Sequence, residues 1–85
     1  MSDHRDALAQ IMRVCAGSQQ YTRRTQQIHD IAMRALGMTL NQRAERHERA
    51  AARSQDMLAV ARVAGWRKAQ EKFAARMAHE EEKEG

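Results

Sequence analysis

Histidine and cysteine side chains are the first candidates for chemistry in this 85-residue chain. The histidines stand at positions 4, 29, 47 and 79, and the single cysteine is Cys15. No two histidines are three or four residues apart, the spacing that places two ligands on one face of a helix. No second thiol exists to complete a tetrahedral site. The sequence therefore predicts neither a metal site nor a bound cofactor.

The patterns that accompany catalysis are also missing. No glycine-rich phosphate loop is present, and no nucleophile stands at motif spacing from a base. Cys15 falls where a helix is expected to end, and the negative end of a helix dipole opposes formation of a thiolate. We therefore predict that the protein is not an enzyme.

Four arginines between residues 41 and 56 form the most distinct charged pattern. They are Arg43, Arg46, Arg49 and Arg53, in a stretch without a large apolar residue. On a helical wheel the last three share one face and the first borders it. Guanidinium groups stay charged and match phosphate oxygens, so this arginine ridge could contact DNA or RNA. The alternative is a solvated helix face, the usual role of such a charge run.

A second set of candidates suits contacts with another protein. The set consists of Leu58, Trp66, Phe73 and Met77, together with His47. Tryptophan is enriched at interface hot spots and methionine at adaptable surfaces. The large apolar members could instead close the core of a helical bundle, and both interpretations stay open.

Charge is distributed unevenly along the chain, whose formal net charge is +4. The last six residues contain four glutamates and one lysine. The preceding 79 residues contain fourteen Lys and Arg against seven Asp and Glu. A basic body with an acidic tail favours an anionic partner without identifying it.

The composition is typical of a helical protein. Sixteen alanines and no proline occur, whereas Trp, Tyr and Phe occur once each. The first residues lack an apolar run long enough for a signal peptide or a membrane span. Together with the single cysteine, this predicts a cytoplasmic location without membrane contact.

We expect an all-α fold, as a helical hairpin or a three-helix arrangement with a long C-terminal helix. One domain covers residues 1–79, with helices at about 3–16, 19–36 and 40–79 and a possible break at Gly65. Gly17 and Gly37 are suited to end helices, and Thr39 with Gln42 has the pattern of a capping box. The acidic tail, residues 80–85, is expected to fray.

The long third helix is predicted to carry two seams. A small-residue seam with heptad-like spacing runs from Leu40 through His47 to Ala69 and would let another helix approach closely. An apolar seam runs from Ala59 through Trp66 to Met77. Because so short a chain buries a small core, we expect self-association through the small-residue seam, or a bound partner.

These features predict a small non-catalytic protein-interaction module. Such an adaptor, regulator or inhibitor would present helical faces to a larger protein and would form a homo-oligomer. The alternative is a DNA- or RNA-binding protein that uses the arginine ridge. Binding through phosphates should weaken steeply with salt, whereas docking of apolar side chains should be far less sensitive.

Overall fold

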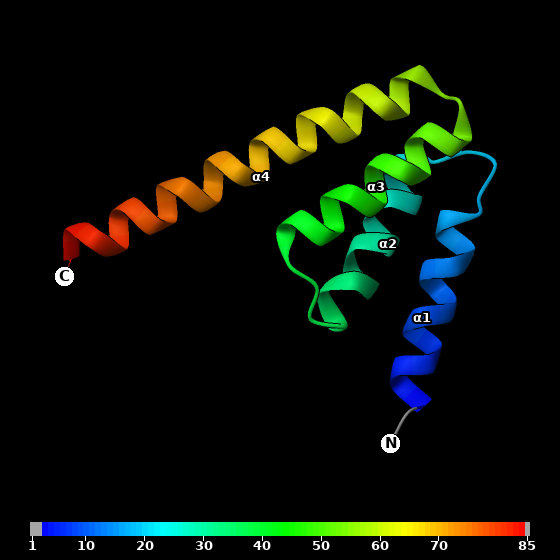
Figure 1. Ribbon diagram of the computed structural model, residues 1–85, viewed down its shortest axis with the longest axis horizontal. Helices are drawn as coiled ribbons and strands as arrows, with labels where there is room; N and C mark the ends of the chain where they lie inside the picture. The colour runs from blue at the N-terminus through cyan, green and yellow to red at the C-terminus, as the bar shows by residue number, and fades with distance from the viewer. Residues whose placement is uncertain (1–2, 85) are drawn as a thin grey trace.

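The computed structural model describes residues 3–84, with side chains from residue 4 to residue 78. Its four helices are α1 (Asp3–Ala16), α2 (Arg23–Ala35), α3 (Leu40–Ser54) and α4 (Met57–Glu84), as Figure 1 shows. No strand occurs in this part of the chain, and the predicted all-α class is confirmed.

The predicted end of the first helix agrees with the observed one, whereas the second helix begins later than predicted. α1 ends at Ala16, and the Gly17 amide donates to the carbonyl oxygen of Arg13 at 3.0 Å. α2 begins at residue 23 rather than 19, because Thr22 is its N-cap. The Thr22 hydroxyl accepts a hydrogen bond from the Thr25 amide at 3.1 Å and so satisfies one of the free amides of the first turn.

The turn between α2 and α3 has the predicted chemistry. Gly37 has a φ of 80°, a left-handed conformation that glycine adopts without a steric penalty. The Gln42 amide donates to the Thr39 hydroxyl at 3.2 Å, and the Thr39 amide donates to the Gln42 side chain at 2.9 Å. This reciprocal pair is the expected capping box, and it fixes the start of α3.

The prediction of one long third helix was wrong, because the structure has two helices in this region. α3 ends at Ser54, and its C-cap Gln55 has a left-handed φ of 58°. Asp56 then caps α4 by accepting from the Leu58 amide at 3.0 Å. Gly65 lies within α4, so the possible break there is also wrong. The overlooked signal is an N-cap aspartate directly before an apolar run. The turn lets α4 fold back along α3.

The helices form two antiparallel pairs that share a core. α1 packs on α2 and α3 packs on α4, while α3 also contacts α1 and α2. One buried cluster joins Tyr21 to small residues of α3 and α4, and the other lies between α1 and α2. The first contains Tyr21, Ala50, Ala51, Ala59 and Val63, and the second contains Met12, Ala32 and Met33. The arrangement has four helices, so the predicted three-helix arrangement is not confirmed.

The small-residue seam does not continue across the turn at Gln55. Ala44, His47 and Ala51 are buried within the bundle, whereas Leu58 and Gly65 of the same predicted seam are exposed on α4. Because the chain changes direction between α3 and α4, the α3 part and the α4 part of the predicted seam no longer share one face. The seam is therefore not one continuous surface, and self-association through it stays a prediction.

The second half of α4 extends beyond the bundle as a projecting helix (Figure 1). We call residues 71–84 the arm; every side chain from residue 71 to residue 78 is exposed. Arg67 is the last residue of α4, within the described chain, that hydrogen-bonds to another helix, and it donates to Glu48 at 2.6 Å. The arm is helical to Glu84, which includes most of the acidic tail. Its fraying stays a prediction.

Candidate functional site

The residues predicted to contact a partner lie in three different environments. Phe73 and Met77 are together on the arm, with 61% and 43% of their surfaces exposed. Leu58 is exposed at the other end of α4, beside the turn, and does not share their surface. Trp66 is half-buried at the base of the arm, and His47 is completely buried. His47 therefore lies in the interior, where no partner reaches it.

His47 belongs to a buried polar network centred on the hydroxyl of Tyr21. The Tyr21 hydroxyl oxygen lies 2.7 Å from Nδ1 of His29 and 2.5 Å from Nδ1 of His47. Nε2 of His47 lies 3.0 Å from Oδ1 of Asp30. The network joins the segment before α2 to α2 and α3, and its two imidazoles and phenol are almost fully buried.

The ionised carboxylate of Asp30 determines where the protons of this network lie. Burial alone would raise the pKa of Asp30, but the hydrogen bond from His47 and the nearby Arg43 guanidinium together hold the pKa below its usual value. Asp30 is thus an acceptor, and His47 donates to it from Nε2. When both imidazoles are neutral, Tyr21 donates to Nδ1 of His47 and accepts from Nδ1 of His29. Each of the three hydrogen bonds that lead from His29 through Tyr21 and His47 to Asp30 then has one donor and one acceptor.

Burial lowers the reactivity of His29, Tyr21 and the nearby Cys15 at neutral pH. Burial and the neighbouring His47 and Arg46 lower the pKa of His29 to about 4, so His29 is uncharged and weakly basic. Burial also raises the pKa of the Tyr21 hydroxyl, which stays protonated. Cys15 is buried as well, and its thiol pKa is raised for the same reason. These groups are suited to holding helices together rather than to nucleophilic attack.

Arg43 and Trp66 cover the network from outside. Nη1 of Arg43 donates to both carboxylate oxygens of Asp30, at 2.9 and 3.1 Å. The Trp66 ring meets the His47 ring edge to face, with 4.8 Å between centroids, and the Arg43 guanidinium carbon lies 5.9 Å from the Trp66 centroid. Arg43 is therefore separated from the predicted arginine ridge, and Trp66 acts mainly as part of the bundle.

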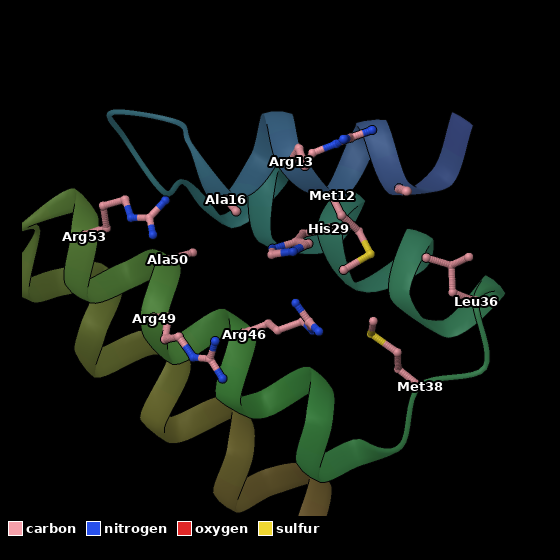
Figure 2. A pocket seen from close by; sticks show the side chains of 11 residues that line it. Met12, Arg13, Ala16, His29, Leu36, Met38, Arg46, Arg49, Ala50 and Arg53 are labelled. Carbon is pink, nitrogen blue, oxygen red and sulfur yellow. The ribbon is translucent and has the colours of Figure 1, made fainter. Parts of the chain in front are cut away.

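The other three ridge residues line a groove between α1, α2 and α3 (Figure 2). We call this the arginine groove; its volume is about 470 Å³. Its lining has no acidic residue and combines an apolar floor with guanidinium groups. The apolar part consists of Ala9, Met12, Ala16, Leu36, Met38 and Ala50, and the polar part of Arg13, Arg46, Arg49, Arg53 and His29. In Figure 2, Arg46 extends from α3 toward His29 and Met38.

Several members of these sites were not predicted from the sequence. Tyr21, His29 and Asp30 were missed because their pairing with α3 depends on how α2 and α3 cross. A useful signal was present: two helices each carry one histidine on their apolar face, and such polar groups need a common partner when buried. Arg13 was missed as a groove residue because it comes from α1, far from the ridge in sequence.

Other kinds of site were also considered. Among the side chains of residues 4–78, no group of three or more His, Cys, Asp or Glu is close enough to hold a metal ion. His79 lies outside the described side chains. None of the described helices is both long enough and apolar enough to cross a membrane.

Comparisons with protein-family models, with curated proteins and with solved structures give no significant match. The function is therefore inferred from the geometry of the described residues.

Proposed function

We propose that this protein is a non-catalytic interaction module whose α4 arm docks onto a protein partner. The single observation that carries the proposal is the exposure of Phe73 and Met77 on a helix that has left its own bundle. These are among the largest apolar side chains of the chain, and they are four residues apart on one face. Exposed apolar surface of this kind is typical of protein-binding sites.

The energetics of an isolated helix support the same function. A helix of about 12–15 residues without tertiary contacts is only marginally stable in water. The arm has that length and makes no hydrogen bond to another helix within the described residues. A partner that covers Phe73 and Met77 would stabilise the helix and remove their apolar surface from water. The role of an adaptor, a regulator or an inhibitor is compatible with such a contact.

The proposal is tested by capture of partners from a lysate with tagged variants of the full chain. The double variant Phe73→Ala/Met77→Ala should lose the proteins that the wild type retains. Lys72→Ala/Arg76→Ala is the matched control, because it removes two exposed polar side chains from the same arm. Equal capture by the wild type and the Phe73→Ala/Met77→Ala variant would contradict the proposal.

A nucleic-acid-binding function is the second candidate, supported by the exposure of three ridge residues. Arg46, Arg49 and Arg53 could each contact a phosphate, whereas Arg43 is already paired with Asp30. The apolar floor of the groove is less suited to a phosphate backbone than to an amphipathic ligand. Binding of duplex DNA that falls steeply with salt, and falls again in Arg49→Ala/Arg53→Ala, would favour this candidate.

A further inference from the structure

The arm of α4 has a chemical counterpart elsewhere in the same chain. We propose that the arm of one molecule docks into the arginine groove of a second copy, and that the two copies do this reciprocally. The inference rests on the proposed function, because it names the partner that receives the arm. It replaces the small-residue seam, which the fold interrupts, as the route to self-association.

The arm is apolar near the bundle and acidic toward its end. Phe73 and Met77 are exposed on one face. In the sequence, glutamates continue the spacing of three and four at positions 80 and 84. A partner for this face needs an apolar surface that leads to positive charge.

The arginine groove provides both requirements. Met12, Leu36 and Met38 form an apolar floor, and methionine side chains adapt to the shape of an aromatic ring. The lining residues include four arginines and no acid. Of these four arginines, only Arg49 forms an ion pair within the described residues, at 3.9 Å from Glu45, and both side chains of that pair are well exposed. The arginines therefore remain available to carboxylates.

The receptor must belong to another molecule because of the direction of α4. The helix is continuous from Met57 to Glu84, and its arm leads away from the bundle that contains the groove (Figure 1). At 1.5 Å per residue the arm is about 20 Å long. Its end cannot return to the groove of its own chain without breaking the helix. A second copy can use the open angle between the arm and the bundle.

The other grooves fit the arm less well. The groove between α1 and α2 exposes Ile11, Val14 and Ile28 but has no charged lining residue that would recognise the glutamates. The cleft between α2 and α4 contains basic residues, but it also contains Asp30. Of these three grooves, only the arginine groove combines an apolar floor with charge of one sign.

Docking would also relieve an unfavourable feature of the arm. Glutamates at the C-terminal end of a helix oppose the helix dipole. Contacts with Arg49 and Arg53 of a second copy would compensate that charge. Exchange of identical arms between two copies gives a closed twofold dimer in which the same contact occurs twice.

The test uses sedimentation of the purified, nuclease-treated full chain over a range of concentrations. The wild type should form a dimer that weakens as salt is raised. Phe73→Ala/Met77→Ala and Arg49→Ala/Arg53→Ala should each weaken dimerisation at least tenfold. Arg23→Ala/Arg24→Ala, which removes equal charge from exposed positions of α2, should leave it unchanged. Circular dichroism verifies that each variant keeps its helices.

Mixing the two weakened variants gives the sharpest result. At a concentration where each is monomeric alone, the arm variant offers an intact groove and the groove variant offers an intact arm. The mixture should therefore form heterodimers through one docked arm. A wild type that stays monomeric at all concentrations, or a mixture without heterodimers, would overturn the inference.

The two proposals can fail separately. If the wild type stays monomeric but arm-dependent capture of another protein persists, the self-docking inference is wrong and the proposed function stands. If Phe73→Ala/Met77→Ala changes neither capture nor assembly, the proposed function is wrong as well. Assembly that requires added nucleic acid would also overturn the inference and favour a phosphate-binding groove.

Discussion

The two halves of α4 differ in the burial of their apolar side chains. Ala59 and Val63 in the inner half are almost fully buried, although they are small. Phe73 and Met77 in the outer half are larger and exposed. All four lie on the same predicted seam, whose successive positions are three or four residues apart when Trp66 and Gln70 are included between Val63 and Phe73. Burial along this helix is therefore decided by whether a neighbouring helix is present. In the proposed function, a partner supplies the neighbour that the outer half lacks.

The inner half is also held by specific polar contacts. Nε of Arg62 donates to Gln26 at 2.9 Å, and another nitrogen of the same guanidinium donates to the Tyr21 carbonyl oxygen. Trp66 covers His47 of the buried network. The outer half relies on its own backbone hydrogen bonds. The comparison predicts that substitutions in the network destabilise the bundle, whereas substitutions in the arm affect assembly.

The largest effect is expected at the centre of the network. Tyr21→Phe keeps the ring but removes the hydroxyl, which leaves Nδ1 of both His29 and His47 without a partner. Unsatisfied buried groups cost about 1–3 kcal/mol each, so the free energy of unfolding should fall by about 3 kcal/mol. Urea denaturation measures this change. A loss below about 0.5 kcal/mol would mean that the network does not stabilise the bundle.

The next largest effect is a loss of stability as the pH is lowered. The pKa of His29 is about 4 in the folded chain, against an ordinary value of 6.5, so between these values the unfolded chain binds more protons. Stability is therefore fully present above pH 6.5 and is lost as the pH falls toward 4. The free energy of unfolding should fall by about 2 kcal/mol between pH 7 and pH 5 from this group alone. An NMR titration of the His29 ring with a midpoint near 6.5 would contradict it.

A smaller effect tests where the chain turns between the two halves of the α3–α4 hairpin. Gln55→Gly should stabilise the protein by about 1 kcal/mol, because glycine adopts the left-handed conformation with less strain. If residues 40–79 were one continuous helix, the same change would destabilise it by a similar amount. Thermal unfolding gives the sign.

Gly65→Ala is the companion to this measurement. Apart from the neighbouring residues and the local helix backbone, no heavy atom lies within 4 Å of the added methyl group, and the position is inside α4. Alanine should therefore stabilise the helix by about 0.5–1 kcal/mol. A helix end at Gly65 would instead make this substitution unfavourable.

The smallest effect on stability belongs to the arm. Phe73→Ala should change the free energy of unfolding of the monomer by less than about 0.5 kcal/mol, because the ring contacts solvent. Val63→Ala removes a smaller group from the core but should cost roughly 2 kcal/mol. Denaturation at low concentration compares the two. A larger loss from Phe73→Ala would place its ring in the core and remove the distinction between the halves of α4.

Local sequence signals predicted much of the fold, and contacts distant in sequence account for what was missed. Gly17, Gly37 and the Thr39–Gln42 box act within a few residues, so their effects could be read directly. The turn at Gln55 needs a left-handed glutamine, which has no strong sequence signature, and it was missed. Arg43 was assigned to the ridge because a helical wheel cannot reveal Asp30 on another helix. The sequence identified Phe73 and Met77 as candidates for partner contacts. Only the fold shows that they lie outside the core.

Amide hydrogen exchange along α4 tests the central claim most directly, namely that the helix has a docked half and a free half. In dilute solution, amides up to about Trp66 should exchange slowly and those of residues 71–84 quickly. At concentrations that produce the dimer, the arm amides should become protected. Equally slow exchange along the whole of α4 in the dilute monomer would contradict the claim, because the arm would then be part of the bundle.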